Sequence, residues 1–120
     1  MKIDLNSLSD AEIRSRIALK DFSSVNLENF NLSDASLSCA NLSNVNLTRA
    51  NLTGANLKSC KLINASFFNC DLENASFLGA ELKGAYLSNA NIDLSIFDYA
   101  DLFRIIQKAG FNVFFNKIGE

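Results

Sequence analysis

From Phe22 to Leu102, every fifth residue of the chain is large and apolar, with no shift of phase. Two residues before most of these positions stands a small residue, usually Ala, and the residue between the two is usually Asn or Asp. Segments such as ANLSN, ANLTG and AELKG show the complete pattern. The seventeen large positions are Phe22, Leu27, Leu32, Leu37, Leu42, Leu47, Leu52, Leu57, Leu62, Phe67, Leu72, Phe77, Leu82, Leu87, Ile92, Phe97 and Leu102.

A period of five residues fits neither an α-helix nor a β-strand, whose periods are about 3.6 and 2.0. The chain must therefore bend at regular intervals, so that each apolar residue returns to a common interior. Four such quintets predict a square turn of twenty residues, with one large and one small residue pointing inward from each side. Asn suits this arrangement because its short amide tolerates turn dihedrals and bonds to nearby backbone. Stacked amides can also form ladders.

The quintets resemble those of the pentapeptide-repeat family, in which a small residue, Asn or Asp, and Leu or Phe precede two variable polar positions. The resemblance covers residues 20–102 and implies an all-β solenoid, a right-handed quadrilateral β-helix. About four coils at the strand spacing of about 4.8 Å predict a rod roughly 20 Å long. Lys20, Val25 and Phe30, with Val45 as a milder case, stand where a small residue is expected. We therefore expect a widened first coil packed against a cap.

Both ends of a solenoid need a cover, because they expose unpaired strand edges. Residues 1–20 predict an N-terminal cap with a helix over about 10–19, since Ser9-Asp10-Ala11-Glu12 is a capping box. Residues 21–102 predict the β-helix. Residues 103–120 predict a C-terminal helix, ended by a glycine, and a short strand-like tail.

The tail is rich in Phe, and Phe111, Val113 and Phe115 alternate like a strand while Phe114 adds apolar surface to the other side. Two interpretations stay open: the tail folds back over the last coil, or it joins two copies in a symmetric interface. Some quinolone-resistance members of the family dimerise through a C-terminal module of this kind. The resemblance thus makes Phe111, Val113, Phe114 and Phe115 a candidate homodimer interface.

Outward positions can be read as columns, because residues twenty apart stack. Phe68 and Tyr86 share one face in neighbouring coils, and Leu78 and Ile96 share another, near Tyr99. Exposed apolar pairs on a surface of Asn, Ser and Thr indicate a candidate partner surface. They are also explained as cross-coil pairs that stabilise a sheet, and both interpretations stay open.

Charge narrows the choice of partner. The 120 residues carry 11 basic and 13 acidic side chains, a net charge of −2, so we expect neither nucleic acid nor an anionic membrane to be bound. One predicted face is acidic, with the candidate residues Asp34, Asp71, Glu73 and Asp93. That face suggests an alternative function, mimicry of DNA in binding gyrase, as in quinolone-resistance relatives. Neutral Asn at most positions where charge would be needed argues against this alternative.

The residue types exclude most chemistry. The chain has no His, which removes His-based triads and His-ligated metals, and its acids lie on a convex rod without a pocket. Of the three cysteines, Cys60 and Cys70 are predicted to point inward and Cys39 outward, so no disulfide is expected. We therefore expect no catalytic, cofactor or metal site. The first residues lack the apolar centre of a secretion signal, and no apolar run approaches about 18 residues, which predicts a cytoplasmic protein.

The sequence thus favours a non-enzymatic interaction module that presents flat β faces to a protein partner. It does not identify that partner. The alternatives left open are the gyrase-binding DNA mimic and a bacterial effector or regulator.

Overall fold

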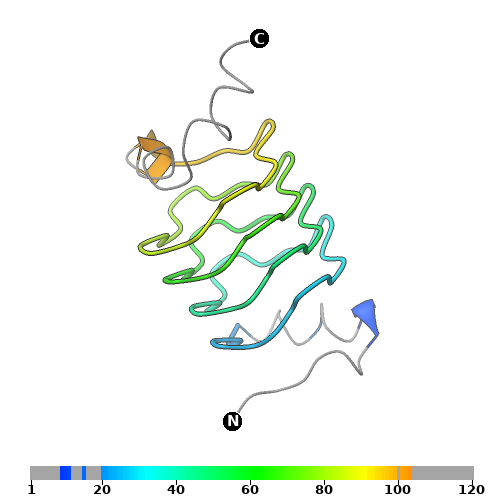
Figure 1. Ribbon diagram of the computed structural model, residues 1–120. Coiled ribbons are helices and arrows are strands. Elements are labelled where there is room, and N and C mark those ends of the chain that lie inside the picture. The colour runs from blue at the N-terminus through cyan, green and yellow to red at the C-terminus, as the bar shows by residue number, and fades with distance from the viewer. Residues whose placement is uncertain (1–8, 12–14, 16–19, 100, 104–120) are drawn as a thin grey trace.

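The structure is a computed structural model that describes residues 9–11, 15, 20–99 and 101–103. The chain winds in stacked coils that bend at matching places (Figure 1). Within the described residues, twelve parallel β-bridges join residues twenty apart, from Asp21 and Asn41 to Ser76 and Ile96. The coil therefore has the twenty-residue period that the repeat predicts.

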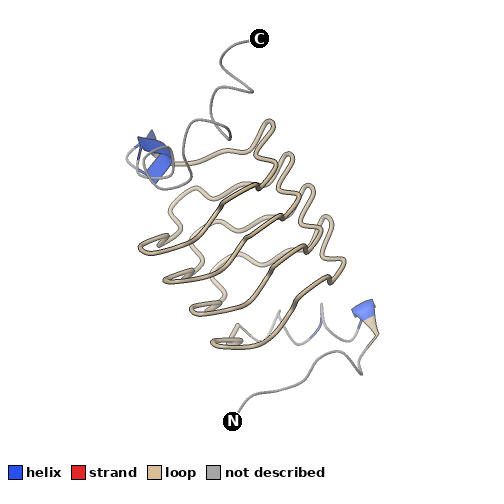
Figure 2. Ribbon diagram, viewed as in Figure 1, coloured by secondary structure: helices blue, strands red, loops and turns tan. Residues whose placement is uncertain are grey.

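Each side of a coil pairs with the next coil through a few backbone groups rather than through a long strand, and the coils are therefore drawn as loops in Figure 2. On the side that holds Leu47, its N–H donates to Ser66 O at 2.8 Å and the Arg49 N–H donates to Phe68 O at 2.8 Å. In return, the Ser66 N–H donates to Val45 O at 3.0 Å. Three hydrogen bonds per side join successive coils and satisfy the buried backbone.

Each corner is a four-residue turn closed by a backbone hydrogen bond, as from Ala50 N to Leu47 O at 2.9 Å. The third residue of the turn has a positive φ at every fifth position from Ser24 to Leu94, which makes fifteen corners. A positive φ at this position is typical of a type II turn, and only Gly and Asn adopt it readily. Asn or Gly fills nine of the fifteen corners, which explains much of the chain's Asn content.

A second set of Asn side chains precedes the large apolar residues and folds back onto the backbone. The Oδ1 of Asn46 accepts the N–H of Thr48 at 3.1 Å, and that of Asn51 accepts the N–H of Thr53 at 3.0 Å. Asx turns of this kind hold the chain at the start of those corners that an Asn or Asp precedes. Single steps of the predicted amide ladder also occur, since Asn46 Nδ2 donates to Asn26 Oδ1 at 3.2 Å.

The large apolar residues fill the interior. Phe67 and Phe77 are fully buried, with ring centroids 5.6 Å apart in an edge-to-face contact, and Phe97 stacks on Phe77 at 4.6 Å. Burying one Leu or Phe side chain contributes about 1.5–3 kcal/mol. Ile92 and Phe97 are only half-buried, because they lie in the last coil, where no further coil covers them.

The β-helix ends four residues before the predicted boundary at Leu102. Tyr99 and residues 101–103 are helical, and Asp98 makes the transition. Its Oδ2 accepts the Gly79 N–H at 3.0 Å, where a backbone carbonyl serves in the lower coils, and its own carbonyl accepts the Leu102 N–H at 3.0 Å. Leu102 therefore keeps the five-residue spacing of the repeat in the sequence, but it lies in a helical segment and not in a coil.

At the other end, Asp10, Ala11 and Ser15 are helical and lie within the helix predicted over about 10–19. The other residues of that prediction lie outside the described ones. The same holds for most of the predicted C-terminal region 103–120.

Candidate interaction surface

Outward side chains of neighbouring coils meet in a fixed register. In two places the residue after a large apolar position contacts the residue eighteen further along the chain. Thr48 Oγ1 and Ser66 Oγ lie 3.3 Å apart in this way. One coil further, the same register brings together Phe68 and Tyr86. The register is a property of the coil length, so it is the same on polar and apolar parts of the surface.

The predicted pair of Phe68 and Tyr86 is stacked, with ring centroids 5.9 Å apart and an angle of 30° between the rings. Phe68 is half-buried and Tyr86 is 51% exposed. An aromatic pair contributes about 0.5–1.5 kcal/mol beyond its buried area. The pair therefore stabilises two adjacent coils and still leaves about half of Tyr86 exposed.

The second predicted set lies on a different side of the coils. Ile96 is bridged to Ser76 in the coil below, and its carbonyl accepts the Phe77 N–H at 2.7 Å, which places Ile96 beside Leu78. Leu78 is 39% exposed and Ile96 49%. Tyr99, at 88% exposed, begins the terminal helical segment just beyond them.

Two further exposed apolar residues were not among the predicted ones. Leu94 occupies a corner with φ 58°, where Asp, Gly and Asn stand in the lower coils, and Phe103 lies in the helical segment. For Leu94 a signal was present, because a large apolar residue breaks the polar rule of that column. The sequence contained no such signal for Phe103, because the β-helix was predicted to end at its neighbour Leu102 and Phe103 belonged to no column.

The exposed apolar residues are all in one part of the molecule. Among the described residues, no large apolar side chain before Leu78 is exposed, whereas six are exposed between residues 78 and 103. They are Leu78, Tyr86, Leu94, Ile96, Tyr99 and Phe103. Among the described residues, the lower coils thus present no exposed large apolar side chain, whereas the upper coils present six.

The four residues of the predicted acidic face, Asp34, Asp71, Glu73 and Asp93, stand in three different columns and do not form a concentrated site. Asp71 Oδ1 accepts the Glu73 N–H at 3.1 Å and the Asn91 Nδ2 at 3.2 Å. Asp34 lies two coils below, beneath Gly54, and Asp93 follows in the last coil. Among the described residues, no group of three His, Cys, Asp or Glu side chains could hold a metal ion.

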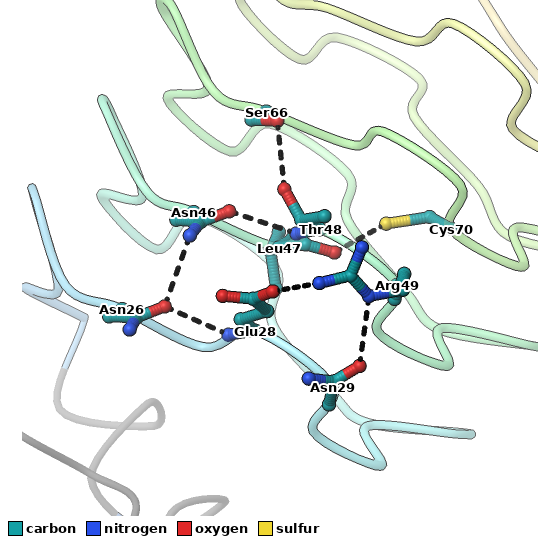
Figure 3. A network of polar contacts seen from close by, with 9 residues as sticks. All are labelled: Asn26, Glu28, Asn29, Asn46, Leu47, Thr48, Arg49, Ser66 and Cys70. Atoms are coloured by element: carbon teal, nitrogen blue, oxygen red, sulfur yellow. Dashed lines mark hydrogen bonds and ion pairs between the residues drawn. The ribbon is translucent and has the colours of Figure 1, made fainter.

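A polar network joins the lower coils (Figure 3). The Arg49 guanidinium pairs with the Glu28 carboxylate, and its Nε donates to Asn29 Oδ1 at 3.3 Å. Both partners are about twenty residues earlier in sequence and lie directly below it. The pair is partly exposed, so its contribution is about 0–1 kcal/mol, and it neutralises one of the acids on the rod.

The cysteines lie as predicted, with Cys39 exposed and Cys60 and Cys70 buried. Each buried thiol donates to the carbonyl of the residue twenty-three earlier: Cys60 Sγ to Leu37 O at 2.9 Å and Cys70 Sγ to Leu47 O at 2.6 Å. Burial raises the pKa of Cys60 to about 11 and that of Cys70 to about 12. These thiols are structural hydrogen-bond donors.

The candidate dimer residues Phe111, Val113, Phe114 and Phe115 lie outside the described part of the chain. No helix within the described part is long and apolar enough to cross a membrane.

A family model for the pentapeptide repeat region matches residues 20–97. The chain belongs to the pentapeptide-repeat family. The resemblance seen in the sequence is thus confirmed, and the β-helix solenoid predicted from it is the fold of the family.

Two solved pentapeptide-repeat structures are similar to the chain. The first is alr5209 from Nostoc PCC 7120, with 32% identity and a TM-score of 0.68 over 71% of this chain and 72% of that one. The second is Rfr23 from the cyanobacterium Cyanothece 51142, with 34% identity and a TM-score of 0.49 over 65% of this chain and 56% of that one. QnrB1, a plasmid-mediated fluoroquinolone resistance protein, is 25% identical, with a TM-score of 0.22 over 78% and 52%. A search of curated proteins found no match.

Proposed function

We propose that this pentapeptide-repeat protein is a non-enzymatic interaction module of about four coils, with helical segments at its ends, that binds a protein partner through the apolar surface of its upper coils. The observation that carries the proposal is the confinement of exposed large apolar side chains to residues 78–103. A rod stabilised by its own core has no need of this asymmetry. Large exposed apolar patches on a folded protein are typical of binding sites.

Two sides of the upper coils offer suitable anchors. The ring of Tyr86 is supported from below by Phe68, and Leu78 is adjacent to Ile96. Supported aromatic and aliphatic side chains lose little conformational entropy on binding, which favours them as anchors. The rigid backbone of the coils holds them in fixed positions before the partner arrives.

The experiment compares capture of proteins from a native lysate of the source organism by the tagged chain and by surface variants. The double variant Leu78→Ser and Ile96→Ser tests one side, and Tyr86→Ser tests the other. Ile63→Ser serves as the matched control, because Ile63 is a half-buried residue of a lower coil. We expect a specific protein to be captured by the parent chain and by the control, and to be lost with at least one test variant. Equal capture by all four chains would contradict the proposal.

The gyrase alternative has one supporting observation, a net charge of −5 over residues 21–103, from nine acidic and four basic side chains. The acids are spread over several columns, and Glu28 is paired with Arg49, so the charge does not form a continuous line like that of a DNA backbone. A supercoiling assay with gyrase separates the two functions. We expect no inhibition by micromolar protein, and inhibition would favour the DNA mimic.

A further inference from the structure

One side of the coils, which we call the Leu78 face, carries two columns of outward residues. Parallel bridges join the first column from coil to coil. Backbone hydrogen bonds fix the second, since the Ser59 N–H donates to Leu78 O at 2.9 Å. In the same way the Cys39 N–H donates to Lys58 O at 2.9 Å one coil below. From the lowest coil upward, the first column is Ser36, Asn56, Ser76 and Ile96, and the second is Ser38, Lys58, Leu78 and Asp98.

The Leu78 face holds one cation and one anion, with an apolar side chain between them. Of its eight outward residues, Lys58 and Asp98 are charged. Lys58 is exposed and lies one coil below the exposed Leu78, and the half-buried Asp98 lies one coil above it. Within the described part of the chain, the ion pair that forms is that of Arg49 with Glu28. The two charges of the Leu78 face therefore do not neutralise each other within one chain.

We propose that a second copy of the chain binds to this face, with the two rods antiparallel and a twofold axis at Leu78. The coil above the axis in one copy then lies against the coil below it in the other. Lys58 of each copy faces Asp98 of the other, and the two Leu78 side chains pack together at the centre. Each copy thus contributes the same residues, as an isologous interface requires, and both ion pairs favour the association.

The charges select this arrangement among those that the face allows. In a parallel twofold dimer each coil lies against its equivalent, so Lys58 does not meet Asp98, which is two coils higher. In an antiparallel dimer, moving the axis up by one coil puts Asp98 against Asp98, and moving it down puts Lys58 against Lys58. Like charges in contact are unfavourable. A shift of half a coil puts Lys58 or Asp98 against Leu78, which buries a charge without a partner.

The Leu78 face is small, which makes the dimer weak. About four coils at about 4.8 Å make the face about 20 Å tall, and the short dimensions of the molecule are 21 Å and 20 Å. Two such faces bury about 800 Å² in total, below the about 1,200 Å² at which stable interfaces begin. We therefore expect a reversible dimer that forms at high micromolar concentration.

Sedimentation equilibrium of the full chain, from micromolar to near-millimolar concentration, tests the proposal. The mass should rise from one chain toward two, and added salt should reverse the rise. Lys58→Glu places like charges opposite each other and should weaken the dimer by at least about tenfold, whereas Lys58→Arg should keep it. Lys61→Glu is the matched control, because Lys61 is exposed on another side of the coils and the net charge changes equally. It should leave the dimer unchanged.

Cross-linking with a short bismaleimide tests the position of the twofold axis. In a chain that also carries Cys39→Ser, Leu78→Cys places two thiols opposite each other at about the 10 Å separation of packed sheets. This variant should become a covalent dimer. The parent is its control, because the exposed Cys39 follows Ser38 in the lowest coil. Two copies of Cys39 lie about 19 Å apart along antiparallel rods, so the parent should not be linked.

Three results would overturn the proposal. One is the mass of a single chain at every concentration. Another is a dimer that Lys58→Glu weakens no more than Lys61→Glu does, which would assign self-association to a different surface. The third is a parent chain that is linked as fast as the Leu78→Cys variant, which would indicate parallel rods.

The proposal rests on the proposed function, because it names the partner of one of the two apolar sides. Phe68 and Tyr86 lie on another side of the coils and stay open to a different protein. The two ideas fail separately. The mass of the purified chain decides the dimer, whereas equal capture from a lysate by all variants would overturn the interaction module, whatever that mass is.

Discussion

Leu94 is the residue whose substitution tests the corner geometry most directly. Among the fifteen described corners it is the one large apolar residue, with φ 58° and a side chain that is 72% exposed. L-residues in the left-handed region cost about 1–2 kcal/mol, and Asn is much less affected because its amide bonds locally. Leu94→Asn should therefore stabilise the protein.

The magnitude follows from two opposing terms. The change removes a backbone cost of about 1–2 kcal/mol. It also removes the buried part of the Leu side chain, about 28% of the residue given its 72% exposure. At about 1.5–3 kcal/mol for full burial, that loss is about 0.4–0.8 kcal/mol. The expected net gain is about 0.2–1.6 kcal/mol, or a rise in Tm of roughly 1–9 °C for a chain of this size.

Urea unfolding followed by circular dichroism at 25 °C measures the effect. The matched control is the reverse change at an ordinary corner, Asn69→Leu, where φ is 57° and the residue is exposed. It should destabilise by about 1 kcal/mol, and the double variant should come close to the parent, because the sites lie in different columns.

A loss of stability in Leu94→Asn would refute this reasoning. It would mean that Leu94 is held by contacts outside the described residues, and that these contacts exceed the corner strain. A neutral Asn69→Leu would refute the assumption that the corners select for Asn through φ.

Three further outcomes are expected. A thiol reagent should label Cys39 alone in the native protein and all three cysteines in denaturant; rapid native labelling of Cys60 or Cys70 would contradict their burial. Because the pKa values of Cys60 and Cys70 are raised to about 11 and 12, the unfolded chain loses these protons first. The free energy of unfolding should thus be constant below about pH 9 and fall above it by up to about 1.4 kcal/mol per pH unit for each thiol. In urea unfolding, the variant with Cys60→Ala and Cys70→Ala should lose less stability per pH unit above about pH 9 than the parent. Phe77→Ala should cost about 3–5 kcal/mol, against about 1–3 kcal/mol for Tyr86→Ala, which loses a half-buried ring and its stacking on Phe68. A larger loss for Tyr86→Ala than for Phe77→Ala in thermal melts would contradict the assigned core.

Much of the fold could be predicted because the repeat is local and redundant. The inward column from Phe22 to Phe97 and the inward Cys60 and Cys70 are where the phase of five places them. The exposed pairs could be predicted as neighbours, but the stacking of Phe68 on Tyr86 could not, because it depends on the rotamers of two side chains eighteen residues apart. The predicted boundary at Leu102 follows the phase of five, which continues in the sequence although Tyr99 and residues 101–103 are helical.

The sequence by itself determined the coil: its period, its inward residues, and the need for Asn or Gly where φ is positive. These follow from steric rules within a few residues, repeated often enough that single exceptions such as Leu94 do not matter. The tertiary structure decided what depends on contact between coils. Only when coils stack does Asp98 meet the Gly79 N–H, Arg49 meet Glu28, and each buried thiol meet a carbonyl twenty-three residues earlier. Such contacts join residues that no local pattern relates, and they set where the solenoid ends and which of its surfaces remain open.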